Sequence, residues 1–206
     1  FAYSSIEHMG IAMIGFGVGG PLGTFGGLLH LLNHAFAKSM AFFAAGNIHR
    51  RFHTVEIGQV HGLAIAQPWT AMALLIAGLA LSALPPFASF VSEMQVVSAL
   101  SAEGVPGQRL TNSSGMVTLA LSGQFSSLGL TGLFLLCAIV AFSGLLYRIT
   151  GMVWGIPPEG IVRGESWTLG HLPIIVLAAA LVGFGFFLPQ FLRQLLEQAT
   201  KILLLR

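Results

Sequence analysis

Long apolar stretches, each closed by glycine, proline or a basic cluster, follow one another along most of the chain. Their length and composition predict membrane-spanning helices over residues 4–20, 24–48, 128–153 and 172–188, with one longer stretch over 68–100. The segment before the fourth span, from Met116 to Ser127, is too polar and interrupted to predict a span of its own. This pattern predicts an all-α, polytopic transmembrane helix bundle with about five to six spans.

The stretch over 68–100 is too long for one straight span. At 1.5 Å per residue it would reach about 50 Å, whereas the hydrocarbon core is about 30 Å thick. Pro85 and Pro86 stand near its middle; the second lacks a backbone donor and forces the first away from helical geometry. We therefore expect a broken helix, with the break near Leu84 to Ser89 and Glu93 just after it.

The two ends of the chain have their own signals. Ser4 and Glu7 fit an S-x-x-E capping box and predict that the first helix starts there. The tail, residues 190–206, predicts an amphipathic helix at the membrane interface or against a partner. Its apolar positions are 191, 192, 195, 196, 199, 202 and 203, set against Arg193, Glu197 and Lys201.

Composition agrees with a lipid environment. Charged residues make up only 8% of the chain and hydrophobic residues 55%, whereas a soluble domain carries about 25% charged residues. The net charge of +2 comes from scattered basic residues, so no nucleic-acid partner is expected. Cys137 lies in an apolar run, and we interpret it as an inert small hydrophobic residue.

Ionisable residues within the spans are the informative ones, because a charge in hydrocarbon costs about 3 kcal/mol or more. His30, His34 and Lys38 are spaced four residues apart. On a helix they share an arc of about 80° and climb about 12 Å along one face. Histidine exchanges protons near neutral pH, so we interpret this stripe as a proton relay in which water bridges the gaps.

Other interpretations of these residues stay open. An intramembrane histidine can simply bond two helices together, and Lys38 could extend its amine to an interface. Two histidines four apart could share a metal, but no clear third ligand follows, so we expect no metal. Glu93 after the break is a transport candidate. Glu7 and His8 are weaker candidates, whereas the remaining histidines lie in or near loops and we expect them to be solvated. These are His49, His53, His61 and His171.

Several segments together resemble a known family. In order they are FAYSSIEHMG, LLHLLNHAFAKSMAFFAAGNI, HRRFHTVEIGQVHGL and LALSALPPFASFVSEMQVV. They resemble the antiporter-like membrane subunits of respiratory complex I (NADH dehydrogenase, quinone-linked) and its relatives. VSEM after the double proline, and the later GIPPEGIVRGE, favour the large proton-translocating subunit of energy-converting nickel–iron hydrogenases, of the hydrogenase-4 and formate hydrogenlyase kind.

The resemblance implies a fold and a set of roles. The family has about fourteen helices built around two inverted repeats of five. Residues 1–153 would be the second repeat, and residues 154–206 a loop, a final span and the amphipathic tail, so we expect a fragment or a split gene. Lys38, with His34 and His30, matches the family's central hydrophilic axis. Glu93 matches the group that connects this axis to the outer side.

The same resemblance implies partners and a location. We expect no cofactor in this chain, because iron–sulfur clusters and nickel–iron or flavin centres belong to partner subunits. Other membrane subunits and a peripheral redox arm would be the partners, in a bacterial or archaeal cytoplasmic (inner) membrane. The expected function is proton translocation driven by redox chemistry. An Mrp-type sodium/proton antiporter subunit and a purely structural anchor remain as alternatives.

Overall fold

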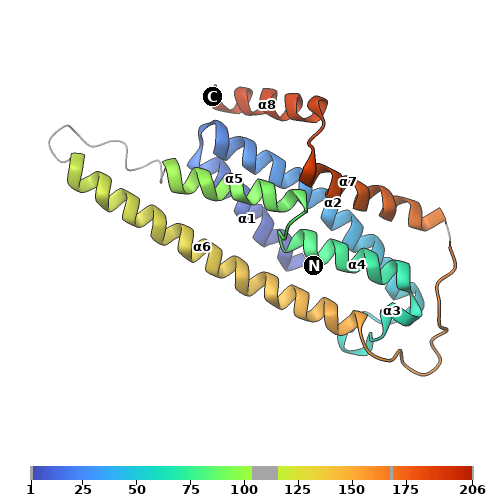
Figure 1. Cartoon of the computed structure of the whole chain (residues 1–206). Helices are drawn as coiled ribbons and strands as arrows, with labels where there is room; N and C mark the ends of the chain where they lie inside the picture. The colour runs from blue at the N-terminus through green and yellow to red at the C-terminus, as the bar shows by residue number, and fades with distance from the viewer. Residues whose placement is uncertain (1, 104–115, 168, 206) are drawn as a thin grey trace.

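A computed structural model describes residues 2–103, 116–167 and 169–205, and these residues form helices joined by turns and loops, with no strand among them (Figure 1). The all-helical fold class is therefore confirmed. The elements in chain order are α1 Ala2–Val18, α2 Gly20–Phe52, η1 Ile57–Gln59, α3 Leu63–Ala66, α4 Pro68–Leu81, α5 Ala88–Glu103, α6 Met116–Val153, η3 Leu169–His171, α7 Leu172–Phe186 and α8 Gln190–Leu204.

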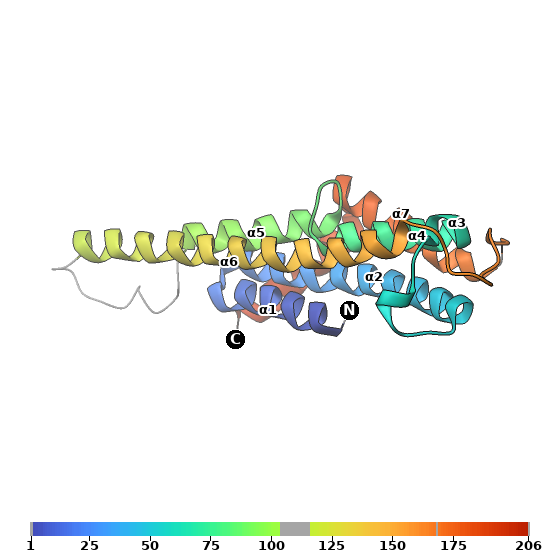
Figure 2. The ribbon, with the colours of Figure 1, turned by 90° about the horizontal axis from the view of Figure 1, so that it is seen from below.

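Helix α2 is the centre of the arrangement. It packs against α1, α4, α5, α7 and α8, and at 33 residues it is about 50 Å long. Helix α6 runs along one flank, where it contacts α4 and α5 (Figures 1 and 2). Helix α8 turns back from the end of α7 and lies against α2. Residues at the middle of α2 are therefore shielded by neighbours on several sides.

Glycines let α1, α2 and α5 approach closely. Gly19 joins α1 to α2 with a φ of 74°, which a residue with a Cβ rarely adopts. A Cβ on Gly15 of α1 would lie 2.8 Å from the carbonyl oxygen of Gly23 on α2, and one on Gly26 would lie 3.2 Å from the backbone nitrogen of Val96 on α5. The three helices therefore meet backbone to backbone along this seam.

The predicted break is confirmed. Helix α4 ends at Leu81 and α5 begins at Ala88, so six residues that include the two prolines separate two short helices. Ala83 has a φ of 46°, and the bond between Pro85 and Pro86 is cis. Gly185 of α7 packs onto this break.

Two boundaries differ from the sequence analysis. Helix α1 begins at Ala2, so Ser4 lies inside the helix and the predicted capping box is wrong. The Ser4 hydroxyl is instead engaged by Lys38. Helix α6 begins at Met116, so the segment before the fourth span is helical although its sequence is polar. The predicted amphipathic tail helix is confirmed as α8.

Within the residues that the structure describes, two helices are long and apolar enough to cross a membrane, at Gly129–Val153 and Leu169–Phe186, and Pro68–Leu81 is a shorter apolar helix. The other expected spans miss this criterion for physical reasons. The break divides one apolar stretch into two short helices, and the polar residues of α2 lower its hydropathy. The expected count of five to six spans thus stays a prediction.

Candidate functional site

Helices α1 and α2 bring three histidines into contact. His8 Nδ1 lies 3.0 Å from His30 Nε2, and the His8 and His34 ring centroids are 4.6 Å apart. His30 is completely buried, and His8 is 1% exposed. We call His34, His8, His30 and the adjoining Ser92 the histidine file. The sequence predicted water bridges between successive groups on α2, but a ring from α1 occupies this space.

Helix α5 extends the file and fixes the direction of its hydrogen bonds. Ser92 Oγ donates to the carbonyl of Ser89 at 2.9 Å, so its single proton is used there. His30 Nδ1, 3.0 Å away, must therefore donate to Ser92 Oγ. In neutral His30 the other nitrogen, Nε2, is then an acceptor, so His8 Nδ1 donates to it. The Asn33 amide also donates to Ser92 Oγ, at 3.4 Å.

Lys38 lies one helical turn beyond His34 and is only 7% exposed. Its Nζ donates to Ser4 Oγ at 2.8 Å and stands 5.6 Å from the centroid of the Phe42 ring, within the range of a cation–π contact. Ser4 is four residues before His8 on α1, so both reach α2 from the same helix face. The buried amine is therefore held beside the histidine file.

Glu93 follows Ser92 on α5 and is 5% exposed. Its Oε1 is buried and has no hydrogen-bond partner among the described residues. Glu7 of α1 is partly buried, and its carboxylate is near enough for its charge to act on Glu93. The structure therefore gathers all six sequence candidates where α1, α2 and α5 meet.

Several polar atoms along this line lack a partner. Among the described residues, the buried atoms without a hydrogen bond include His8 Nε2, His34 Nδ1, Asn33 Oδ1 and Glu93 Oε1. Buried polar atoms without partners are uncommon in folded proteins, and such groups are typically served by internal water. A line of them is chemically suited to relay protons.

Sequence reasoning underestimated two members of the site and missed two. His8 was a weak candidate, and Glu7 was explained by a capping box that does not form. Ser4 and Ser92 were not candidates at all. One signal was available: Ser4 and His8 have the same four-residue spacing as His30 and His34. No local signal marks Ser92, because its role depends on contact with another helix.

A second polar cluster lies where the loop after α6 reaches α4. Glu165 accepts hydrogen bonds from the Thr70 backbone at 2.9 Å, the Thr70 hydroxyl at 2.6 Å and His171 Nε2 at 2.9 Å. The expectation that His171 is solvated is therefore wrong, since it is 4% exposed. Burial raises the pKa of Glu165, but the bonds from Thr70 and His171 outweigh burial and hold the pKa below its ordinary value.

The other candidate groups stay outside both clusters. His49, His53 and His61 are exposed, as predicted, and so is Cys137. In the part of the chain that the structure describes, no three histidine, cysteine or acidic side chains are arranged to hold a metal ion.

Comparisons with known proteins agree with this picture. The hydrogenase-4 component F homolog of Methylacidiphilum infernorum is 46% identical over 98 residues, which are 48% of this chain and 21% of that protein. Hydrogenase-4 component B of Escherichia coli K12 is 40% identical over 136 residues, 59% of this chain and 20% of that protein. The chain thus matches about a fifth of the length of these relatives.

A solved structure shares the fold. In the Mrp complex from Dietzia sp., one chain superposes with a TM-score of 0.71 at 20% identity, over 98% of this chain and 41% of that chain. The family described as "NADH:quinone oxidoreductase/Mrp antiporter, TM" matches residues 1–118, more than half of the 206 residues. The resemblance found in the sequence is thereby confirmed. The chain belongs to this membrane family of NADH:quinone oxidoreductase and Mrp antiporter subunits.

Proposed function

We propose that the protein containing this chain moves protons across a membrane, and that the histidine file is part of their path. The observation that carries the proposal is that imidazole rings and a serine hydroxyl from three helices contact one another directly. These groups lie between Lys38 and Glu93, which are both buried. Ionisable groups in hydrocarbon are costly. Their presence here is explained if they face an internal polar path.

The bond directions support a specific sequence of transfers. A proton that arrives at His8 Nε2 makes that ring cationic, and its Nδ1 proton can then pass to His30 Nε2. His30 in turn releases its Nδ1 proton to Ser92 Oγ, and Ser92 passes on its own hydroxyl proton, which must first turn away from the Ser89 carbonyl. Each transfer leaves a ring in the opposite tautomer. The rings must therefore reset before the next proton passes.

Lys38 and Glu93 would form the two ends of this path. Lys38 can hold or release a proton beside His34, and its charge acts on the histidines near it. Successive residues on a helix do not face each other, so the proton that leaves Ser92 would need water to reach Glu93. The Glu93 carboxylate has one oxygen unpaired among the described residues and can accept it. Because α5 starts at a break, this end lies beside irregular backbone that lipid cannot cover.

We further propose the setting of the chain. Residues 1–153 would be an antiporter-like repeat, and residues 154–206 would supply a loop, a final span and the tail, within a total of five to six spans. Its partners would be membrane subunits and a peripheral redox arm, in a bacterial or archaeal inner membrane. Iron–sulfur, nickel–iron or flavin centres would lie in those partners. Relatives named as hydrogenase-4 components support a redox-driven complex.

The test replaces each end of the path in the full-length protein. Lys38→Ala and Glu93→Ala should abolish most proton transport in sealed vesicles while the complex still assembles. Lys38→Arg keeps the positive charge, but a guanidinium does not release its proton, so transport should be lost there too. Glu159→Ala, at an exposed loop position, is the matched control and should pump normally. Unchanged pumping by the Lys38 and Glu93 variants would refute the proposal.

A sodium/proton antiporter subunit is the second candidate, because the matching family includes Mrp antiporters. Glu93 offers a buried carboxylate oxygen, the kind of ligand that a hard cation prefers. Sodium flux that is lost in Glu93→Ala would favour this function. A structural anchor predicts instead that transport survives these changes and that removal of α8 disrupts assembly.

A further inference from the structure

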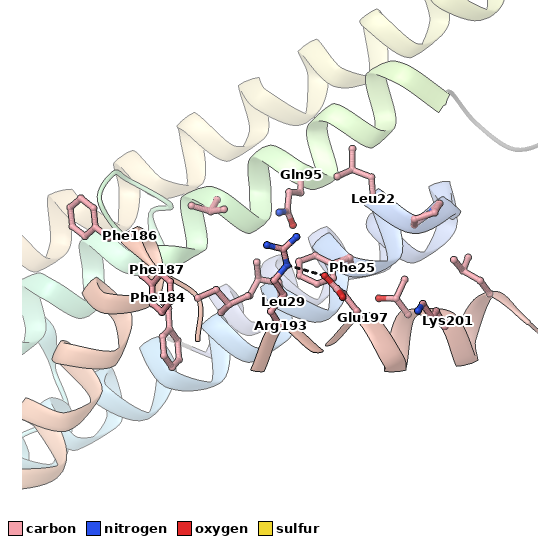
Figure 3. A pocket seen from close by; sticks show the side chains of 15 residues that line it. Leu22, Phe25, Leu29, Gln95, Phe184, Phe186, Phe187, Arg193, Glu197 and Lys201 are labelled. Atoms are coloured by element: carbon pink, nitrogen blue, oxygen red, sulfur yellow. Dashed lines mark hydrogen bonds and ion pairs between the residues drawn. The ribbon is translucent and has the colours of Figure 1, made fainter. Parts of the chain in front are cut away.

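A groove of about 770 Å³ opens between α8 and the bundle (Figure 3). Its walls come from the start of α2, the middle of α5, the end of α7 and one face of α8. Its size is typical of a site for a small molecule. It lies apart from the histidine file and is not explained by proton transport.

The two sides of the groove differ in chemistry. The bundle side is apolar and is formed largely by Phe25, Leu29, Phe184 and Phe187. The α8 side carries Arg193, Glu197 and Lys201, four residues apart and therefore on one helix face (Figure 3). The groove is thus amphiphilic across its width.

Helix α8 turns this charged stripe towards the groove, buries Leu196 and leaves several other apolar residues outside. Phe191, Leu195 and Ile202 are 72%, 45% and 61% exposed. An amphipathic helix on a soluble protein does the reverse and buries its apolar face. In a membrane protein the outward residues can contact lipid. The Arg193 and Glu197 side chains on the groove side are 67% and 45% exposed, so a polar or charged occupant can reach them.

The charges of the stripe indicate what that occupant is. Arg193 Nε donates to Glu197 Oε1 at 2.9 Å, and two cations with one anion leave a net charge of +1. Within the described ranges Lys201 makes no ion pair. One anionic group would balance the stripe, and an apolar tail would cover the aromatic wall.

We propose that this groove binds one anionic phospholipid from the bilayer. Its phosphate would lie at Lys201, which can donate a charge-assisted hydrogen bond away from the carboxylate of Glu197, since Glu197 is paired with Arg193. Its acyl chain would lie along the apolar wall of Phe25 and Phe187. The lipid then joins α8 to the bundle by covering the apolar wall and the charged stripe together. A zwitterionic lipid fits less well because it leaves the net positive charge of the stripe unbalanced.

The test is lipid retention by the full-length protein reconstituted in nanodiscs. The discs contain phosphatidylcholine with or without phosphatidylglycerol, and native mass spectrometry counts the lipids kept after mild delipidation. The wild type should keep one phosphatidylglycerol. The double variant Arg193→Gln and Lys201→Gln should keep about thirtyfold less, at about 1 kcal/mol for each basic residue and about 1.4 kcal/mol for each factor of ten. Arg163→Gln, an exposed cation in the loop before α7, is the charge-matched control and should retain lipid normally.

A second measurement does not depend on removing charge. A photoreactive benzoylphenylalanine in place of Leu22, at the groove wall and 40% exposed, should form its adduct with phospholipid. The proposal is overturned if the adduct is a protein segment, if phosphatidylcholine is kept equally well, or if the double variant binds as much phosphatidylglycerol as the control. Proton transport is a separate readout, so either proposal can fail alone.

Discussion

Replacing Gly185 with alanine should force α7 away from the break between α4 and α5. The new Cβ would collide with the carbonyl oxygen of Pro86, and would lie 2.9 Å from the Pro86 carbonyl carbon and 3.0 Å from that of Phe87. Ordinary carbon contacts begin at about 3.5 Å, so the helix must retreat by at least about 0.6 Å. Backbone atoms, unlike a flexible side chain, cannot turn aside.

The net cost can be worked out from two opposing contributions. Overpacking costs up to about 3 kcal/mol, whereas alanine gains about 1 kcal/mol over glycine in a helix. Gly185→Ala should therefore destabilise the bundle by about 2 kcal/mol. Gly183→Ala is the matched control, since a Cβ there meets nothing within 4 Å, and it should gain about 1 kcal/mol.

Thermal unfolding in detergent, followed by tryptophan fluorescence, measures the difference. At about 2–4 °C for each kcal/mol, the two variants should differ in Tm by about 6–12 °C. Proton transport should also fall in Gly185→Ala, because the break positions Glu93. Equal Tm values for the two variants, or a higher Tm for Gly185→Ala, would refute the inferred contact between α7 and the break.

Two further predictions concern the polar clusters. Glu165→Gln should lower the unfolding temperature at pH 7. The folded pKa of Glu165 lies below its ordinary value of 4.5, so its stabilisation is complete above pH 4.5. The difference in unfolding temperature between wild type and variant should narrow as pH falls below 4.5 and through the folded pKa. Unfolding scans at pH 7 and pH 4 check this, and a constant gap would contradict it. His8→Ala should slow proton transport at least about tenfold, with partial rescue by added imidazole, whereas exposed His53→Ala should have no effect. An imidazole-independent defect would indicate a structural role for His8.

The sequence predicted features that local physics determines. Two adjacent prolines interrupt a helix wherever they occur, so the position of the break could be predicted. The shared face of His30, His34 and Lys38 follows from helical geometry alone. The tail helix follows from its alternation of apolar and charged positions. These features need no knowledge of neighbouring helices.

Contacts between distant segments could not be predicted in the same way. His8 and His30 are 22 positions apart, and His30 and Ser92 are 62 apart, so their hydrogen bonds depend on how helices pack. The capping box failed because Ser4 bonds to Lys38 within a helix that starts earlier. His171 looked like a loop residue because its partner, Glu165, stands in a segment without periodic pattern.

The glycine seam gives the proposed proton path a mechanical property. Where Gly15 meets Gly23 and Gly26 meets Val96, the main chains approach closely, with only side-chain atoms of Val96 and Gln95 beside them. The three helices should therefore tilt together when the bilayer thins or thickens, and the spacing between imidazoles should stay constant. Conduction through this segment should then be insensitive to acyl-chain length.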